Sequence, residues 1–202
     1  MTKITTVDLM RHGEVEGGSR FRGSTDDPLT ELGWQQMLDT LNAGSEWTQI
    51  ISSPLQRCKK FAAHWSEENS LPLSINNNFQ EMHFGDWEGK TAEEIIVSSP
   101  DALEKFWQNP ERFAPANSER LSEFKHRILT AWKEIIKQQQ GKHVLLISHG
   151  GVIRSILAHI LEMPDHALLK LEIPLAGISR VNIYHERDKP DSSSLVFHAG
   201  SL

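Results

Sequence analysis

Two apolar runs of the chain end in the same pair of residues, a histidine followed by a glycine. The first run, residues 4–10, is rich in β-branched residues and leads into Arg11, His12 and a glycine. The second run, residues 143–148, leads into His149 and two glycines. Short apolar runs bounded in this way predict buried β-strands. We therefore expect two buried strands with an imidazole at the carboxyl end of each.

The segments between these runs carry apolar residues at helical spacing. Thr30 is a suitable N-cap for a first helix. Ser53 is expected to cap a second helix, with Pro54 at its first position, where a missing N–H costs nothing. Thr91 and Glu94 form the pattern of a capping box before a short helix. Further helices are predicted over residues 102–108, 121–136 and 152–160.

The remaining apolar runs predict strands, at residues 48–52, 71–75, 168–173, 177–185 and 195–199. Strands that alternate with helices favour a doubly wound α/β fold. We expect a three-layer α/β/α sandwich with a mostly parallel sheet, helices on both faces and antiparallel pairing at the C-terminal end. Two short helices and the loop after them interrupt the alternation, which predicts a small helical insertion or lid at about 90–117. Residues 1–202 are expected to form a single domain.

The composition limits the classes of partner. The chain of 202 residues has 21 Lys and Arg against 27 Asp and Glu, and its formal net charge is −6. This balance argues against a broad nucleic-acid footprint, which needs clustered excess basic residues. The single cysteine, Cys58, allows neither an internal disulfide nor a structural zinc site, and its spacing suits a helix core. No stretch resembles a membrane span or a signal peptide, so we expect a cytoplasmic protein without nucleic-acid or membrane partners.

The strand ends can place several anion-binding groups together. Ligands of open α/β sheets bind at the carboxyl ends of the strands, where Arg11 and His12 are expected beside His149. Arg57, about one turn into the second predicted helix, adds a guanidinium near a helix N-terminus. A phosphoryl group in transfer needs such positioning and charge stabilisation. A neutral imidazole held by a main-chain carbonyl can attack phosphorus, and Glu81 is the candidate donor of a proton to the leaving oxygen.

Five short motifs stand in the order of a known family. They are Leu-Met-Arg-His-Gly-Glu at 9–14, Pro-Leu-Thr-x-x-Gly at 28–33, Ser-Ser-Pro-x-x-Arg at 52–57, Glu-Met-His-Phe-Gly-Asp-Trp-Glu-Gly at 81–89 and Ser-His-Gly-Gly at 148–151. The chain thereby resembles the histidine phosphatase superfamily, also called phosphoglycerate-mutase-like, over nearly its whole length. The resemblance implies that fold, a small-molecule phosphate monoester as substrate, and no metal or other cofactor.

The same resemblance implies a role for each candidate residue. His12 is the nucleophile that becomes phosphohistidine. Arg11, Arg57 and His149 hold the phosphoryl group, together with Gly150. Glu81 is the proton donor and later the base that activates water.

The length of one segment and the sequences of two loops limit the choice of substrate. The chain is short after the Glu81 loop, where the mutases of the family carry extra sequence, and this points to a phosphatase. Residues 84–89 and 115–119 resemble the α-ribazole phosphatase branch, which serves cobalamin biosynthesis. The expected substrate is therefore α-ribazole 5′-phosphate. A broad-specificity phosphatase or a phosphoglycerate mutase-like enzyme is the alternative.

Substrate contacts are expected from residues around these loops. The family's asparagine after the first motif is absent here, and Arg22 is expected to replace part of its contact with the phosphate. The other candidate substrate contacts are Ser24, His83 and Asn117. Trp87 and Trp107 are expected in an aromatic core rather than at the mouth of the site.

Two hypotheses of other classes stay open on the sequence alone. The first is a metallohydrolase that uses His12, His83 and His149, although the chain lacks the usual spacings of zinc ligands. The second is a non-catalytic binder of phosphorylated ligands on the same scaffold, because fold does not fix function.

Overall fold

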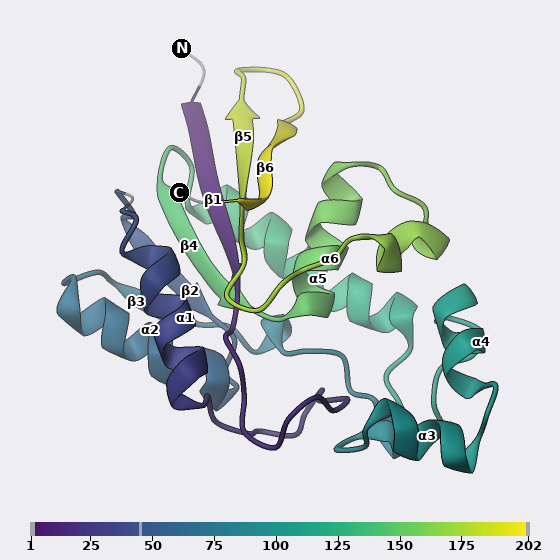
Figure 1. Cartoon of the computed structure of the whole chain (residues 1–202). Coiled ribbons are helices and arrows are strands. Elements are labelled where there is room, and N and C mark those ends of the chain that lie inside the picture. The colour runs from purple at the N-terminus through teal and green to yellow at the C-terminus, as the bar shows by residue number, and fades with distance from the viewer. Residues whose placement is uncertain (1–2, 45, 201–202) are drawn as a thin grey trace.

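A six-stranded sheet in the order β3-β2-β4-β1-β5-β6 forms the centre of the computed structural model, which describes residues 3–44 and 46–200 (Figure 1). The strands β1, β2, β3 and β4 pair in parallel, whereas β5 and β6 pair antiparallel at the end of the sheet. The predicted sandwich with a mostly parallel sheet is confirmed. The strand bounds are β1 (Lys3–Arg11), β2 (Gln49–Ser52), β3 (Leu73–Ile75), β4 (His143–Ser148), β5 (Ile178–His185) and β6 (Ser192–Gly200).

Helices cover both faces of this sheet, because its central strands are apolar on both sides. Along β4, Leu145 and Ile147 pack against α1 (Glu31–Leu41) and α2 (Gln56–Glu68). The alternate residues Val144 and Leu146 pack on the opposite face against α5 (Leu121–Gln138) and α6 (Gly150–Ile160) (Figure 1). None of the helices in the described ranges combines the length and the apolar character that crossing a bilayer requires.

Two short helices form a lobe beyond the edge of this sandwich. They are α3 (Ala92–Ser98) and α4 (Ala102–Gln108), at the lower right of Figure 1. The predicted capping box at the start of α3 is confirmed, since Thr91 and Glu94 each bond the other's main-chain N–H. The lobe has a small core of its own, made of Trp87, Ile95, Leu103 and Phe106. Short 3₁₀ turns, η1 (Asn77–Phe79) and η2 (Gly85–Trp87), lead into it.

Two local predictions are wrong. Residues 168–173 do not form a strand; the chain there includes the 3₁₀ segment η3 (Asp165–Lys170). Leu168 packs into the core beside α6, and an apolar run of this length does not distinguish a strand from a buried turn. The second correction concerns α2, whose N-cap is Leu55 rather than Ser53. The Ser53 hydroxyl accepts from Leu55 N at 3.3 Å, before the helix begins, and it also bonds His149 Nε2 at 2.7 Å.

A buried carboxylate links β1 to three neighbouring segments. Asp8 is fully buried, and its oxygens accept hydrogen bonds from Trp47 Nε1 at 2.8 Å, His143 Nε2 at 2.9 Å and Arg180 Nε at 2.8 Å. Burial by itself raises the pKa of Asp8, but the bonds from His143 and Arg180 outweigh it and hold the pKa below its ordinary value. The carboxylate therefore stabilises the centre of the sheet as an anion.

We expect Asp8→Asn to destabilise the protein by about 2–3 kcal/mol at neutral pH, because it leaves buried donors without their charged acceptor. Urea unfolding measures the change. The pKa of Asp8 is lower in the folded chain than its unfolded value of about 3.9. The contribution of the carboxylate is thus complete above that pH and is lost as the pH falls toward the folded pKa. The difference between the variant and the wild type should accordingly shrink below about pH 4.

The matched control is Asp39→Asn, which alters an exposed carboxylate that accepts a bond from Gln35. A surface change of this kind should shift stability by less than about 0.5 kcal/mol. Equal effects of the two substitutions would contradict the role assigned to Asp8.

Candidate active site

The parallel pairing of β1 with β4 brings the two strand-end histidines together. Arg11 lies opposite Ser148 in the register of the two strands. The pairing continues one residue further, since His12 N donates to Ser148 O at 3.0 Å. The rings of His12 and His149 consequently meet edge to face, with their centroids 5.3 Å apart. The two matching motifs thus lie side by side at the carboxyl edge of the sheet.

The His12 ring is held in a single orientation and is uncharged at neutral pH. Its Nδ1 lies 2.8 Å from Gly13 O, which can only accept, so Nδ1 carries the proton. The lone pair is then on Nε2. Burial, followed by the charges of Arg57 and Arg11, lowers the pKa of His12 to about 3. The ring therefore offers an unprotonated nitrogen over the whole physiological pH range.

His149 is completely buried behind His12. Its Nδ1 accepts a hydrogen bond from Arg57 Nε at 3.2 Å, and its Nε2 donates to Ser53 Oγ at 2.7 Å. Burial, together with the neighbouring charge of Arg57, lowers the pKa of His149 well below its ordinary value. Both ring nitrogens are thus engaged with protein groups.

Arg57 lies near the start of α2 and is 1% exposed. Besides its bond to His149, it donates to Thr25 O at 2.7 Å and to Gly23 O at 3.0 Å, which fastens the loop after β1 over the histidines. The neighbouring Cys58 is also buried, and burial raises the pKa of its thiol to about 12. Cys58 is therefore a core residue, in agreement with the sequence prediction.

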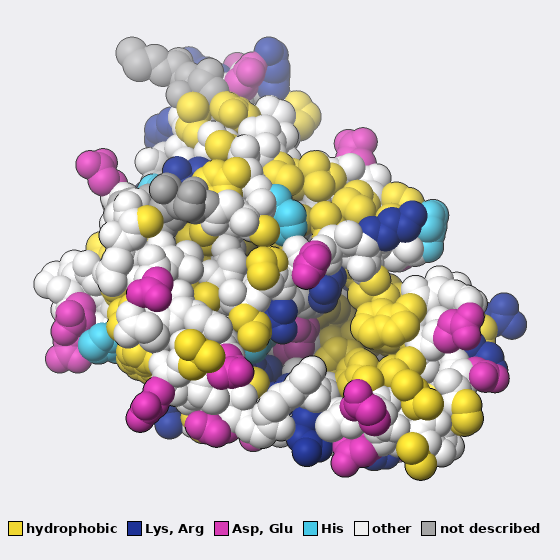
Figure 2. Space-filling model, viewed as in Figure 1, with side chains coloured by type: hydrophobic (Ala, Val, Ile, Leu, Met, Phe, Trp, Pro, Cys, Tyr) yellow, Lys and Arg dark blue, Asp and Glu magenta, His cyan; other side chains and the backbone are white. Residues whose placement is uncertain are grey.

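A cleft of about 320 Å³ opens beside these groups, and Arg11, His12, Glu81, Gly150 and Arg154 line it. Figure 2 shows a hollow between the body of the molecule and the α3–α4 lobe, with basic and acidic side chains inside it. Arg11 Nη1 donates to Ile173 O at 2.6 Å, whereas Arg11 Nε is buried and has no partner among the described residues. A Cβ placed on Gly150 would lie 3.6 Å from that Nε. The unpaired Arg11 Nε thus lies beside the N-terminus of α6, and both groups favour the binding of an anion there.

The carboxylate of Glu81 is fixed at the same helix end. Its oxygens accept from Gly151 N and Met82 N, each at 2.9 Å. The glycine at position 151 makes this close approach possible, because an added Cβ would lie 2.3 Å from Glu81 Oε1 and would displace the carboxylate. Arg127 on α5 holds the loop from the other side by donating to the carbonyls of Gln80 and Glu81. Glu81 therefore borders the cleft from a rigid loop.

Of the four candidate substrate contacts, one lines the cleft and three do not. Arg22 lines the cleft, but it donates to Asp27, Gly18 O and Glu16 O, so it braces its own loop. Ser24 bonds His83 at 2.9 Å, and Asn117 donates to Asp86 at 2.9 Å. These last three candidates, Ser24, His83 and Asn117, lie outside the lining of the cleft.

The two tryptophans also differ in their surroundings. Trp87 is buried in the core of the lobe, as expected, whereas Trp107 is 50% exposed. The expectation that Trp107 belongs to the core is wrong. Its ring borders a second pocket, next to the cleft.

Arg154 is a site residue that the sequence analysis missed. It lies on α6, one turn after Gly150, and its Nε donates to Leu171 O at 2.8 Å. Burial lowers the pKa of Arg154, with opposing contributions from Glu81 and Glu172. A charged residue four positions after Gly150, on a mostly apolar helix, is the signal that could have identified it.

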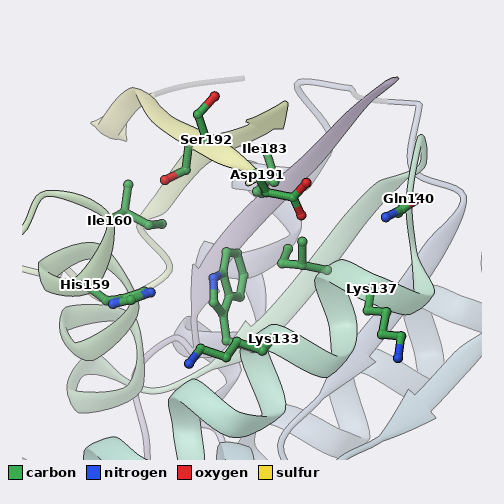
Figure 3. Close-up of a pocket in the computed structure, with 11 residues that line it drawn as sticks. Lys133, Lys137, Gln140, His159, Ile160, Ile183, Asp191 and Ser192 are labelled. Atoms are coloured by element: carbon green, nitrogen blue, oxygen red, sulfur yellow. The ribbon is translucent and has the colours of Figure 1, made fainter. Parts of the chain in front are cut away.

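One further hollow lies apart from this site, and the described residues also test the metal hypothesis. A separate hollow of about 450 Å³ is formed by α5, α6 and the β5–β6 end, and Lys133, Lys137 and Asp191 line it (Figure 3). It contains none of the motif residues. Within the described ranges, no three His, Cys, Asp or Glu side chains gather as metal ligands would. His83 in particular pairs with Ser24 and Glu88 rather than with the other two histidines.

Comparison with known proteins gives a consistent family match. The family model of the histidine phosphatase superfamily (branch 1) matches residues 7–194. The glucosyl-3-phosphoglycerate phosphatase of Mycolicibacterium vanbaalenii is 30% identical over 173 residues, which cover 80% of this chain and 76% of that protein. The adenosylcobalamin/α-ribazole phosphatase of Escherichia coli is 26% identical over 179 residues, 87% of this chain and 88% of that protein.

A solved structure extends the likeness to the fold. The structure of Bacillus stearothermophilus YhfR superposes with a TM-score of 0.87 at 28% identity, over 98% of each chain. Longer mycobacterial relatives, 29% identical over 203 residues, are matched over only 55% of their own length.

We expect the His12 imidazole to stay neutral between pH 8 and pH 5, since its pKa is lowered to about 3. An NMR titration of protein labelled with ¹³C in its histidine rings measures this. The signal missing from His12→Gln identifies the residue, and its shift should be flat over that range. A midpoint near the ordinary value of about 6.5 would show that the ring is not shielded as the structure indicates.

Proposed function

The chain belongs to the histidine phosphatase superfamily (branch 1), and from this premise we propose that it hydrolyses phosphate monoesters through a phosphohistidine on His12. The observation that carries the proposal is the state of the His12 ring. The ring is neutral, its Nδ1–H is fixed on Gly13 O, and it borders a cleft with an unpaired Arg11 donor. A nucleophile with that geometry needs no metal or separate base to attack phosphorus.

The first step transfers the phosphoryl group to the enzyme. His12 Nε2 attacks phosphorus while the bond from phosphorus to the ester oxygen breaks. Glu81, as the acid, gives its proton to that leaving oxygen and becomes a carboxylate. The positive charge that forms on the ring is stabilised at Nδ1–H by the carbonyl of Gly13.

The second step returns the enzyme to its starting state. The Glu81 carboxylate takes a proton from a water molecule as that water attacks phosphorus. The bond between Nε2 and phosphorus breaks, inorganic phosphate leaves, and His12 is again neutral. Glu81 borders the cleft beside the first turn of α6, where one residue can serve both steps.

Charge on the transferring group is balanced by groups that are already ordered. Arg11 and the N-terminus of α6 at Gly150 face the cleft directly. In this proposal Arg57 and His149 complete the binding of the phosphoryl oxygens. His149 then exchanges its Ser53 hydroxyl for a phosphoryl oxygen, and Arg57 uses N–H groups beyond those that hold Gly23 and Thr25.

For the substrate, we propose α-ribazole 5′-phosphate, and hence a role in cobalamin biosynthesis in the cytoplasm. The loop motifs at 84–89 and 115–119 and the E. coli relative named for that substrate support it. A relative named for glucosyl-3-phosphoglycerate is at least as similar in sequence, which makes that ester the second candidate. We further propose that residues 1–202 act as one catalytic domain, with the insertion at 90–117 beside the cleft.

Two variants test the proposed intermediate with p-nitrophenyl phosphate, whose leaving group departs without a proton. Glu81→Gln should still form phosphohistidine but hydrolyse it slowly, because no base activates the water. Labelled phosphate should therefore accumulate on this variant to about one equivalent, in an acid-labile form. His12→Asn should take up no label and should lose at least about 10³-fold in kcat. Label or full turnover in His12→Asn would refute the mechanism, and so would turnover in wild type only when a divalent metal is added.

A panel of esters tests the substrate. We expect kcat/KM for α-ribazole 5′-phosphate to exceed that for glucosyl-3-phosphoglycerate and 3-phosphoglycerate by about 100-fold or more. Comparable values for all three would favour a broad-specificity phosphatase. Tight phosphate or vanadate binding without turnover of any ester would favour the non-catalytic alternative.

A further inference from the structure

A second, apolar pocket of about 100 Å³ adjoins the phosphate cleft. We call it the apolar pocket and define it by Phe21, Phe84, Phe106, Trp107, Leu168 and Leu169. It shares Phe21, Phe84, Glu81 and Arg154 with the lining of the cleft, so the two spaces lie side by side. Whatever is attached to a phosphoryl group in the cleft therefore has this pocket as its neighbour.

Trp107 on α4 forms the outer wall of the apolar pocket. Its ring packs edge to face on Phe106, with 5.5 Å between centroids, and lies at a tilt 6.5 Å from Phe21. Half of the residue is still exposed. Figure 2 shows hydrophobic side chains along the lobe side of the hollow. An exposed aromatic ring that is oriented by its neighbours, and that borders a pocket, is typical of a binding surface.

The lining determines which chemistry fits. Its charged members are Glu81 and Arg154, both at the boundary with the cleft, and its walls are aromatic and aliphatic. A sugar or carboxylate inside would lose hydration without gaining hydrogen bonds. A flat apolar ring has little hydration to lose on entering the pocket, and it gains contact with the aromatic walls.

We propose that the apolar pocket binds a flat, apolar ring in the alcohol part of the substrate, and that Trp107 determines this specificity. The inference rests on the proposed phosphatase function and deepens it by assigning the subsite. The benzimidazole of α-ribazole is a ring of this class. The ring is then held between the lobe and η3 while the phosphoryl group occupies the cleft.

The test compares 2-(naphthalen-1-yl)ethyl phosphate with ethyl phosphate, two primary alkyl esters with similar leaving groups. In the wild type, kcat/KM for the naphthyl ester should be about 30-fold higher or more. Trp107→Ala should reduce that preference about tenfold through KM, and should leave kcat/KM for ethyl phosphate within about twofold. Trp107→Phe should retain most of the preference, since it keeps an aromatic wall.

The control variant is Val97→Ala on α3, which removes an 86% exposed side chain of the same lobe. This substitution should change kcat/KM for neither ester. Equal kcat/KM for the two esters in the wild type, or an unchanged ratio in Trp107→Ala, would overturn the assignment of the pocket. A loss of kcat for both esters in Trp107→Ala would also overturn it, because that pattern reports a structural role.

Direct binding separates this inference from the proposed function. The two esters are titrated calorimetrically into His12→Asn, which is not expected to turn them over. A Kd for the naphthyl ester about tenfold or more below that for ethyl phosphate supports the pocket even if no ester is hydrolysed by the wild type. Equal Kd values would reject the pocket even in an active phosphatase.

Discussion

The parallel pairing of β1 with β4 is the constraint on which the site depends. The register that sets Arg11 opposite Ser148 also sets the two following histidines side by side. A shift of one residue would turn Val7 and Leu9 toward the opposite face of the sheet. The core packing of the strands and the meeting of the two rings therefore depend on the same register. The catalytic geometry is in this sense a consequence of the way in which the sheet buries its apolar residues.

The site concentrates buried polar groups, and their hydrogen bonds decide which of them can react. Arg57 and His149 bond each other, Ser53 and loop carbonyls, so in the proposed mechanism they reach the phosphoryl group only through an exchanged bond or a further N–H. His12 and Arg11 keep one group each that faces the cleft or lacks a partner. Because both rings are buried, and because two guanidiniums lie nearby, the pKa of each imidazole is lowered and the rings are neutral rather than cationic. The positive charge is thus carried by the arginines, and the nucleophile keeps its lone pair.

The α3–α4 lobe connects stability with specificity. Phe106 packs on Trp87 within the core of the lobe and on Trp107 at its surface. Phe21 joins the same aromatic group from the loop after β1, the loop that Arg57 holds over the histidines. The wall of the apolar pocket is therefore ordered by contacts from both sides of the cleft. The insertion at 90–117 therefore forms part of the surroundings of the cleft, although it lies outside the sandwich.

The sequence by itself determined the features that depend on local pattern. The strands that precede His12 and His149 follow from short apolar runs, and the capping box and short helices of the lobe follow from spacing within a few residues. The motif order also identified the family. Each of these signals is contained in neighbouring positions, so no knowledge of distant contacts is needed to detect it.

Only the tertiary structure decided which distant groups meet. Ser53 resembles a helix cap in the sequence, but its hydroxyl bonds His149, 96 positions away. Arg154 borders the cleft because α6 turns one face toward the loop of Glu81, and Trp107 is exposed because the lobe ends at the pocket. The run at 168–173 begins in the 3₁₀ segment η3 and continues without regular structure, and Leu168 packs into the core beside α6 rather than in a strand. Such outcomes depend on packing between segments far apart in the chain, and hydrophobic periodicity carries no information about which surfaces will face each other.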